Sequence, residues 1–471
     1  MTLRGQLARS RFTRSRFTHL IASYGLAQLS IALGAILRIP LTVGAIGVGG
    51  LGTVLVVGAV VPLLLIPGVG LRSAARTLFA EDFARGGQRL RRTNRQGVVL
   101  TRRVATPLAA FTLCLVPLDL LHLGSDRGLT AVQVITVLLG VASLDGLWFW
   151  GALEALDKAH VPNLGTLCVT IGGLVAVACL AAWGAPLELF VLANVATSTL
   201  PFLVASIVGR RCVAKALIDV VEHDEQPVDG LLAATMNYSV RGLANAITRG
   251  SEPLVVNGFL AASAVGVFTL AQRFGIGIAL VSVAILPRLA AQSAQRRSQG
   301  SGRTYAEVTR LMRRTMIFSL VPTACYLGLV TPVVRMMAGP EAVGPPALYL
   351  TVALASLLLA VESPLEASLS GGVSLRSTRW ALLSSATVTL AISLCATYLF
   401  GVAGPAIGAI AGLVLLMAQE LRILRKLEVT GDRTLMSGPA RPPAPRLAGA
   451  RHRPSDSVSQ VWPQSADPSP G

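Results

Sequence analysis

Two consecutive apolar segments of this chain carry polar side chains that suit the binding of an anion. In the first, Asn237, Arg241, Asn245 and Thr248 follow one another at spacings of three to four residues, which places them on one stripe of a helix. In the second, Arg273 lies at a depth similar to that of Arg241. Guanidinium groups match the oxygens of phosphate and pyrophosphate, so the pair is interpreted as a substrate-binding site. The alternative is that both arginines are structural, bonded to backbone carbonyls or acidic side chains.

Three further charged residues lie inside or at the ends of apolar segments. Arg38 and Arg249 occupy equivalent places at outer helix ends, where they either reach the interface or contribute to gating and substrate binding. Asp145 lies within an apolar segment beside Trp148 and Trp150. It is a candidate for coupling transport to a proton or cation, and the alternative is a pair with an arginine or a place near the inner interface.

Signals for an enzyme are poor. The five histidines lie at segment ends, in loops or in the tail, and no HExxH, DxD, P-loop or nucleophile-elbow pattern occurs. The six cysteines have no metal-ligand spacing. We therefore predict a chain that is not an enzyme, with no metal and no cofactor. The net charge of +18 is distributed between apolar segments without a basic, aromatic-interleaved domain, which argues against a nucleic-acid partner and for contacts with the lipid bilayer.

The composition of the chain indicates which structural elements position these residues. Of 471 residues, 53% are hydrophobic and only 14% are charged, with a mean hydropathy of +0.64. The apolar residues come in blocks of about 20, the length that crosses a bilayer as helix. The fold class is therefore all-α, a polytopic membrane protein with about twelve transmembrane helices in two six-helix bundles. The expected spans are 18–38, 46–70, 98–121, 129–153, 161–183, 187–209, 230–249, 264–287, 314–336, 346–368, 380–400 and 403–424.

The distribution of basic residues orients the spans. With the N-terminus in the cytoplasm, 35 of the 41 lysines and arginines fall in cytoplasmic segments, as the positive-inside rule requires. We expect a cell (inner) membrane protein whose N- and C-termini are both cytoplasmic. The expected division is a basic N-terminus (1–17), an N-terminal bundle (18–209), a cytoplasmic linker (210–229), a C-terminal bundle (230–424) and a disordered tail (425–471).

The stretch 247–294 resembles the seventh and eighth helices of polysaccharide-lipid flippases, which belong to one superfamily with the MATE multidrug exporters and the lipid II flippases. The likeness rests on the run Ala264 to Phe268 (AVGVF), the run Ala271 to Arg273 (AQR) and Leu286-Pro287. The first two spans, with Tyr24-Gly25, Gln28 and Arg38, are similar to that family's start. The resemblance covers about residues 1–425. It implies a MATE-like fold and a central cavity lined by cationic residues, a role that Arg241 and Arg273 would fill.

The function implied is a transporter that flips an undecaprenyl-pyrophosphate-linked oligosaccharide across the inner membrane for polysaccharide biosynthesis. The lipid-linked oligosaccharide would be its substrate, with glycan polymerases or glycosyltransferases as candidate partners. Two alternatives remain open. One is a cation-coupled multidrug exporter of the same fold, for which Asp145 is the candidate acidic residue. The other is a membrane-embedded glycan-processing enzyme, whose candidate groups are Asp119, Asp126 and Glu341.

Overall fold

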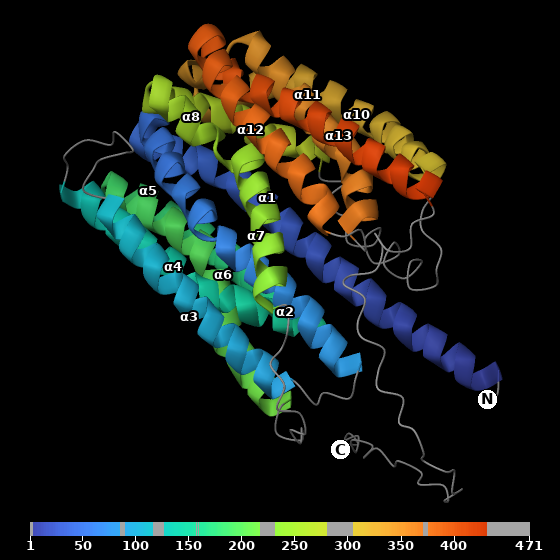
Figure 1. Ribbon diagram of the computed structural model, residues 1–471. Helices are drawn as coiled ribbons and strands as arrows, with labels where there is room; N and C mark the ends of the chain where they lie inside the picture. The colour runs from blue at the N-terminus through green and yellow to red at the C-terminus, as the bar shows by residue number, and fades with distance from the viewer. Residues whose placement is uncertain are drawn as a thin grey trace, which may run out of the picture.

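The computed structural model is built of helices that cross the molecule side by side (Figure 1). It describes residues 3–84, 90–115, 127–156, 158, 160–216, 231–279, 305–370 and 375–430. Within these ranges no strand occurs, and twelve helices are long enough to span a bilayer. The predicted all-α polytopic membrane fold is confirmed.

The first two predicted spans form one helical element, α1 (Leu3–Leu64), which is interrupted at Gly47. Gly47 has φ 73° and ψ 177°, a backbone conformation that side chains with a Cβ avoid, and it reverses the chain between two helices. The second of these runs on into α2 (Ile66–Ala84), because Leu65 N and Val69 N donate to the carbonyls of Val61 and Leu65 at 3.0 Å. The second helix is thus longer than the predicted span 46–70.

The remaining helices of the first half are α3, α4, α5 and α6, and those of the second half begin with α7. Their bounds are α3 Leu90–Leu115, α4 Arg127–Ala155, α5 His160–Trp183, α6 Leu187–Ala216, α7 Leu231–Gly250, the short α8 Glu252–Phe259, the helix Ala262–Ala279, α10 Tyr305–Ala338, α11 Pro346–Ser370, α12 Leu375–Phe400 and α13 Gly404–Thr430. Two short 3₁₀ turns, Pro340–Ala342 and Gly401–Ala403, precede α11 and α13.

Hydropathy and length alone identify eight stretches that are apolar enough to cross a membrane. Two of them, 29–64 and 378–426, each contain parts of two consecutive helices. The membrane-length helices outside these eight stretches are α3 and α7, and both are rich in polar or basic residues. These two helices must turn their polar sides toward protein or the interface.

The helices gather in two groups. Within residues 3–216, α1 packs on α5 and α6, and α4 packs on α2 and α6; within residues 231–430, α12 packs on α13 and α7, and α11 on α10 and α13. In Figure 1 the groups lie on opposite sides, with α1, α2 and α7 between them, and α2 packs along α7. The bundle boundaries 18–209 and 230–424 stay predictions. The predicted tail lies outside the described residues beyond 430, and most of the predicted linker lies outside them from 217 on.

The groups are joined tightly at the Gly47 end. Ile39, Leu51, Leu55 and Val56 of α1 belong to one buried apolar cluster with residues of the helix Ala262–Ala279 and of α10 and α11. Backbones touch here: a Cβ placed on Gly52 would lie 1.7 Å from the carbonyl oxygen of Ala262, and one on Gly266 would lie 2.7 Å from that of Val48. We call this contact the Gly52 seal. Only glycine permits such an approach.

Candidate functional site

A cavity of about 360 Å³ lies within the first group of helices. Its walls come from α1, α2, α4, α5 and α6, and one side chain, Arg273, reaches in from the helix Ala262–Ala279 of the second group. The polar lining residues are cationic, hydroxyl or amide groups: Arg38, Arg72, Asn163, Thr166, Thr170, Asn194, Thr197, Ser198 and Arg273. The apolar lining residues are Ala27, Ile31, Ala35, Trp150, Pro201 and Phe202. We call this space the central cavity.

Arg38 forms one wall of the central cavity. Its Nη2 donates a hydrogen bond of 3.0 Å to the carbonyl oxygen of Thr170 in α5. Its Nε is buried and has no hydrogen-bond acceptor among the described residues. Gly173 leaves room for this side chain, since a Cβ there would lie 2.7 Å from Nη2. The predicted outer helix end at Arg38 is instead mid-helix, because α1 continues to the break at Gly47.

Arg273 reaches the same cavity from the other group. Its Nη1 donates a hydrogen bond of 3.2 Å to the carbonyl oxygen of Ala35, one turn before Arg38 in α1. A second, smaller space is also lined by both arginines, together with Asn194 and Thr42. Within the described part of the chain, neither arginine forms an ion pair with a carboxylate. Two like charges in a partly desolvated space are costly without a counter-charge, which favours an anionic ligand between them.

A third arginine, Arg72 of α2, also lines the cavity. Its guanidinium carbon lies 4.7 Å from the centroid of a Trp150 ring, and it forms an ion pair with Glu154, whose side chain is only 5% exposed. Arg76 lies 3.8 Å from the other oxygen of Glu154. Trp150 in turn packs on Phe202, with ring centroids 5.4 Å apart. This wall combines an aromatic face with a neutralised arginine.

Hydroxyl and amide groups from α5 and α6 complete the lining. Asn163, Thr166 and Thr170 recur every three to four residues along α5, and on α6 Thr197 and Ser198 follow Asn194 by three and four residues. Each set therefore lies on one helix face. Thr166 and Thr197 also donate to the carbonyls four residues earlier in their own helices, which satisfies them in the absence of ligand.

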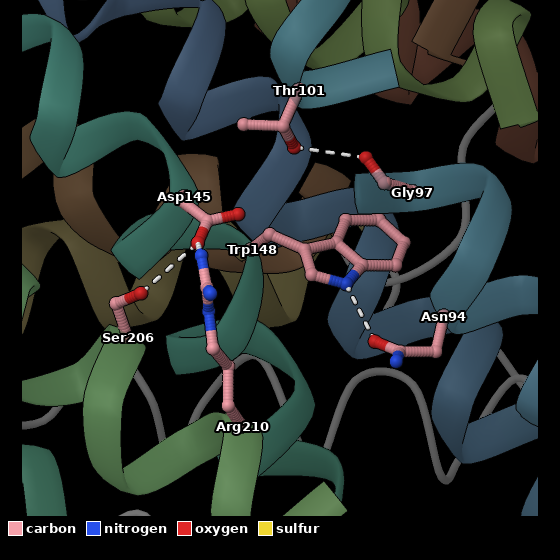
Figure 2. A network of polar contacts seen from close by, with 7 residues as sticks. All are labelled: Asn94, Gly97, Thr101, Asp145, Trp148, Ser206 and Arg210. Atoms are coloured by element: carbon pink, nitrogen blue, oxygen red, sulfur yellow. Dashed lines mark hydrogen bonds and ion pairs between the residues drawn. The ribbon is translucent and has the colours of Figure 1, made fainter. Parts of the chain in front are cut away.

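Asp145 of α4 lies in a polar network with Ser206 and Arg210 of α6 (Figure 2). Its Oδ2 accepts hydrogen bonds from Ser206 Oγ at 3.0 Å and from Arg210 Nε at 3.2 Å. The structure thus has the arginine pair that was one interpretation of Asp145, while its coupling role stays a prediction. Oδ1 is buried without a hydrogen bond among the described residues. Nearby, Trp148 donates to Asn94 at 3.2 Å.

Of the predicted binding residues, the structure brings Arg38 and Arg273 together. Asn237, Arg241, Asn245 and Arg249 are on the α7 backbone, but their side chains lie outside the described residues, as do those of Tyr24 and Gln28. Sequence reasoning missed Arg72, because it was counted with the basic residues after the second span. It also missed the lining of α5 and α6, although the three-to-four-residue spacing of Asn and Thr was a usable signal.

Comparisons with known proteins support the fold. No protein-family model and no curated protein sequence matches the chain. Solved structures do match. A MATE-family multidrug resistance transporter of the MOP superfamily, in an inward-facing conformation, has a TM-score of 0.65 at 13% identity, covering 87% of this chain and 100% of that one. The lipid II flippase MurJ, in an inward closed conformation, has a TM-score of 0.61 at 14% identity, covering 86% of this chain and 90% of that one.

A third solved structure differs in the character of its pocket. It is a MOP superfamily transporter from Pyrococcus furiosus, described as having a binding pocket of reverse polarity, with a TM-score of 0.64 at 12% identity over 88% of this chain and 96% of that one. Identities this low show the fold alone, so the chain has the MATE-like fold that was predicted. The substrate of this protein has to be inferred from the chemistry of its cavity.

Proposed function

We propose that this protein flips an undecaprenyl-pyrophosphate-linked oligosaccharide from the inner to the outer leaflet of the cytoplasmic membrane, with both chain ends in the cytoplasm. The observation that carries the proposal is the position of Arg38 and Arg273. They come from opposite groups of helices and line one hydroxyl-rich cavity, bonded only to backbone carbonyls among the described residues.

The chemistry of the cavity supports an anionic, hydroxylated headgroup. Arginines bind phosphate oxygens through paired N–H donors, and a diphosphate offers enough oxygens for both. Threonine, serine and asparagine exchange hydrogen bonds with sugar hydroxyls as donors or acceptors. Trp150 and Phe202 give one wall of the cavity an apolar, aromatic character, which suits the carbon face of a sugar ring.

The size of the cavity sets how much of the substrate it holds. A volume of about 360 Å³ is at the small end of ligand sites and suits a diphosphate with its first sugars, not a polyprenyl chain. The lipid chain would stay in the bilayer and pass between helices. The Gly52 seal packs the two groups together at the Gly47 end, so we expect headgroups to enter from the opposite end.

The main rival is a cation-coupled multidrug exporter, which the similarity to a multidrug resistance transporter supports. A cavity for amphiphilic cations needs an acidic residue that faces the ligand. Here the cavity's arginines face inward, while the nearby carboxylates of Glu154 and Asp145 pair with arginines. These charges favour an anionic substrate. For the enzyme alternative, Asp119 and Asp126 lie outside the described residues, and Glu341 lies in the short turn Pro340–Ala342.

Deletion of the gene tests the proposal. Lipid-linked saccharides should accumulate in the inner leaflet, where an added, membrane-impermeant glycosidase cannot reach them in intact cells, and surface glycan should fall. Expression of the wild-type chain should reverse both effects, while a chain with Arg38→Ala and Arg273→Ala should be inserted but inactive. Unchanged lipid-linked saccharides together with lost resistance to cationic drugs would support the exporter and overturn the flippase.

A further inference from the structure

A second, larger recess of about 680 Å³ shares no lining residue with the central cavity. It is lined by the first half of α3 and the first residues of α7, with Arg91, Arg92, Arg95 and Arg103 on one side and Val99, Leu100, Leu231 and Leu232 as its apolar part. We call it the α3–α7 groove.

The sequence of α3 explains why the arginines gather there. Arg91, Arg95, Val99 and Arg103 follow one another at intervals of four residues, so they form one inclined row along the helix surface. The opposite face carries Thr93, Gly97 and Thr101, which are buried against neighbouring helices. Gly97 packs on Trp148, since a Cβ there would lie 2.0 Å from the indole. α3 is therefore fixed by one face and presents its basic row on the other.

The groove has both a charged and an apolar part. Arg91, Arg95 and Arg103 are exposed, and so are Val99 and Leu232, which are 43% and 59% exposed. An inorganic anion would use only the arginines and leave the apolar surface uncovered. A molecule with a phosphate at one end and hydrocarbon at the other would cover both, with the phosphate near the start of α3 and the chains along Val99 and Leu232.

We propose that the α3–α7 groove binds one anionic glycerophospholipid from the leaflet that surrounds this end of the molecule. The phosphodiester accepts hydrogen bonds from Arg91 and Arg95 near the start of α3, Arg103 adds positive charge further along the helix, and the acyl chains pack on Val99 and Leu232. This site is separate from the central cavity and does not depend on what the protein transports. Because α3 belongs to the first group of helices and α7 to the second, the bound lipid touches both groups and favours arrangements that keep these helices at their present separation.

Lipid retention measured by native mass spectrometry tests the proposal. The full chain is reconstituted in phosphatidylcholine vesicles that contain phosphatidylglycerol, extracted in mild detergent and examined for bound lipid. We expect one tightly retained phosphatidylglycerol per protein. The variant Arg91→Gln/Arg95→Gln/Arg103→Gln should hold it about a hundredfold more weakly, because each arginine near an anionic lipid surface contributes several-fold to binding.

A matched control removes the same charge elsewhere. Arg310, Arg313 and Arg314 are exposed on the surface of α10, so the variant Arg310→Gln/Arg313→Gln/Arg314→Gln should retain the lipid as the wild type does. Leu232→Trp keeps the arginines of the groove and fills its apolar part, so it should also lower lipid retention. This variant replaces the α3 variant as the test if the α3 variant does not fold. Equal retention in the α3 variant and the α10 control, or in Leu232→Trp and the wild type, would overturn the proposal. Equally tight binding of glycerol phosphate would show a site for free phosphate and overturn the lipid assignment.

Discussion

Arg273 donates a hydrogen bond of 3.2 Å from Nη1 to the backbone carbonyl of Ala35, so a side chain of the second group of helices completes a cavity that otherwise belongs to the first. The bond places its guanidinium one helical turn from Arg38. A cavity built in this way has its full positive charge only while the two groups are close together. Substrate binding and the relative position of the groups are therefore linked.

Removal of either cavity arginine should lower transport. Arg273→Ala and Arg38→Ala should each reduce flipping of a lipid-diphosphate-saccharide in reconstituted vesicles by about 10- to 100-fold, the loss expected for one or two charge-assisted hydrogen bonds. Arg→Lys at either position should retain part of the activity, because it keeps the charge and loses the paired donors. Wild-type rates in both alanine variants, at equal protein levels, would remove these residues from the binding site.

The Gly52 seal should be sensitive to a single added side chain. Gly52→Val places atoms where the Ala262 carbonyl lies, and overpacking of this kind costs about 1–3 kcal/mol. We expect a lower Tm in detergent, followed by tryptophan fluorescence, and reduced transport. Gly44→Val is the matched control on the same helical element, since a Cβ at Gly44 meets nothing within 4 Å. Equal Tm values for the two variants would show that the seal does not contribute to stability.

The Asp145–Arg210 pair can be tested by exchange of its charges. Asp145→Ala and Arg210→Ala should each lower the Tm slightly, because the arginine is 55% exposed and exposed pairs contribute under about 1 kcal/mol. We expect Asp145→Arg/Arg210→Asp to restore both the Tm and transport, as befits a structural pair. A swapped chain that regains its Tm but stays inactive would instead favour the coupling role predicted for Asp145.

Removal of the charge of Glu154 should change the binding of an anionic ligand in the cavity, whereas removal of the charge of its exposed partner Arg76 should not. Glu154→Gln removes a nearly buried carboxylate beside Arg72, which should raise the positive charge at the cavity wall and tighten the binding of a soluble diphosphate-sugar probe severalfold. Arg76→Gln, at a side chain that is 58% exposed and 3.8 Å from Glu154, should change neither binding nor Tm measurably. Isothermal titration of the two variants with the same probe checks this, and weaker binding in Glu154→Gln would contradict it.

The sequence predicted the helices well, because most of them carry their own signal of length and hydropathy, with α3 and α7 as the exceptions among the membrane-length helices. Arg273 was also found, since an arginine within an apolar segment is conspicuous. Arg72 was not, because its position just beyond the second predicted span made it look like a topology signal. Asn163 and Asn194 were missed for another reason: a neutral amide shows its role only when the facing helices are known. Which helices face one another depends on tertiary packing, and single-helix patterns do not contain it.

The polarity of α7 also has a consequence for how the chain enters the membrane during synthesis. α7 is a poor substrate for insertion on its own, because Arg241 lies near the centre of this 20-residue helix, where an arginine adds about 2.5 to 3.5 kcal/mol. Its packing partner in the first group, α2, is made earlier and is already in place when α7 leaves the ribosome. The order of the helices in the chain thus provides α7 with a helix to pack against at the moment of its insertion. A chain permuted to begin at α7 should insert this helix poorly, and glycosylation mapping of nascent chains would measure that.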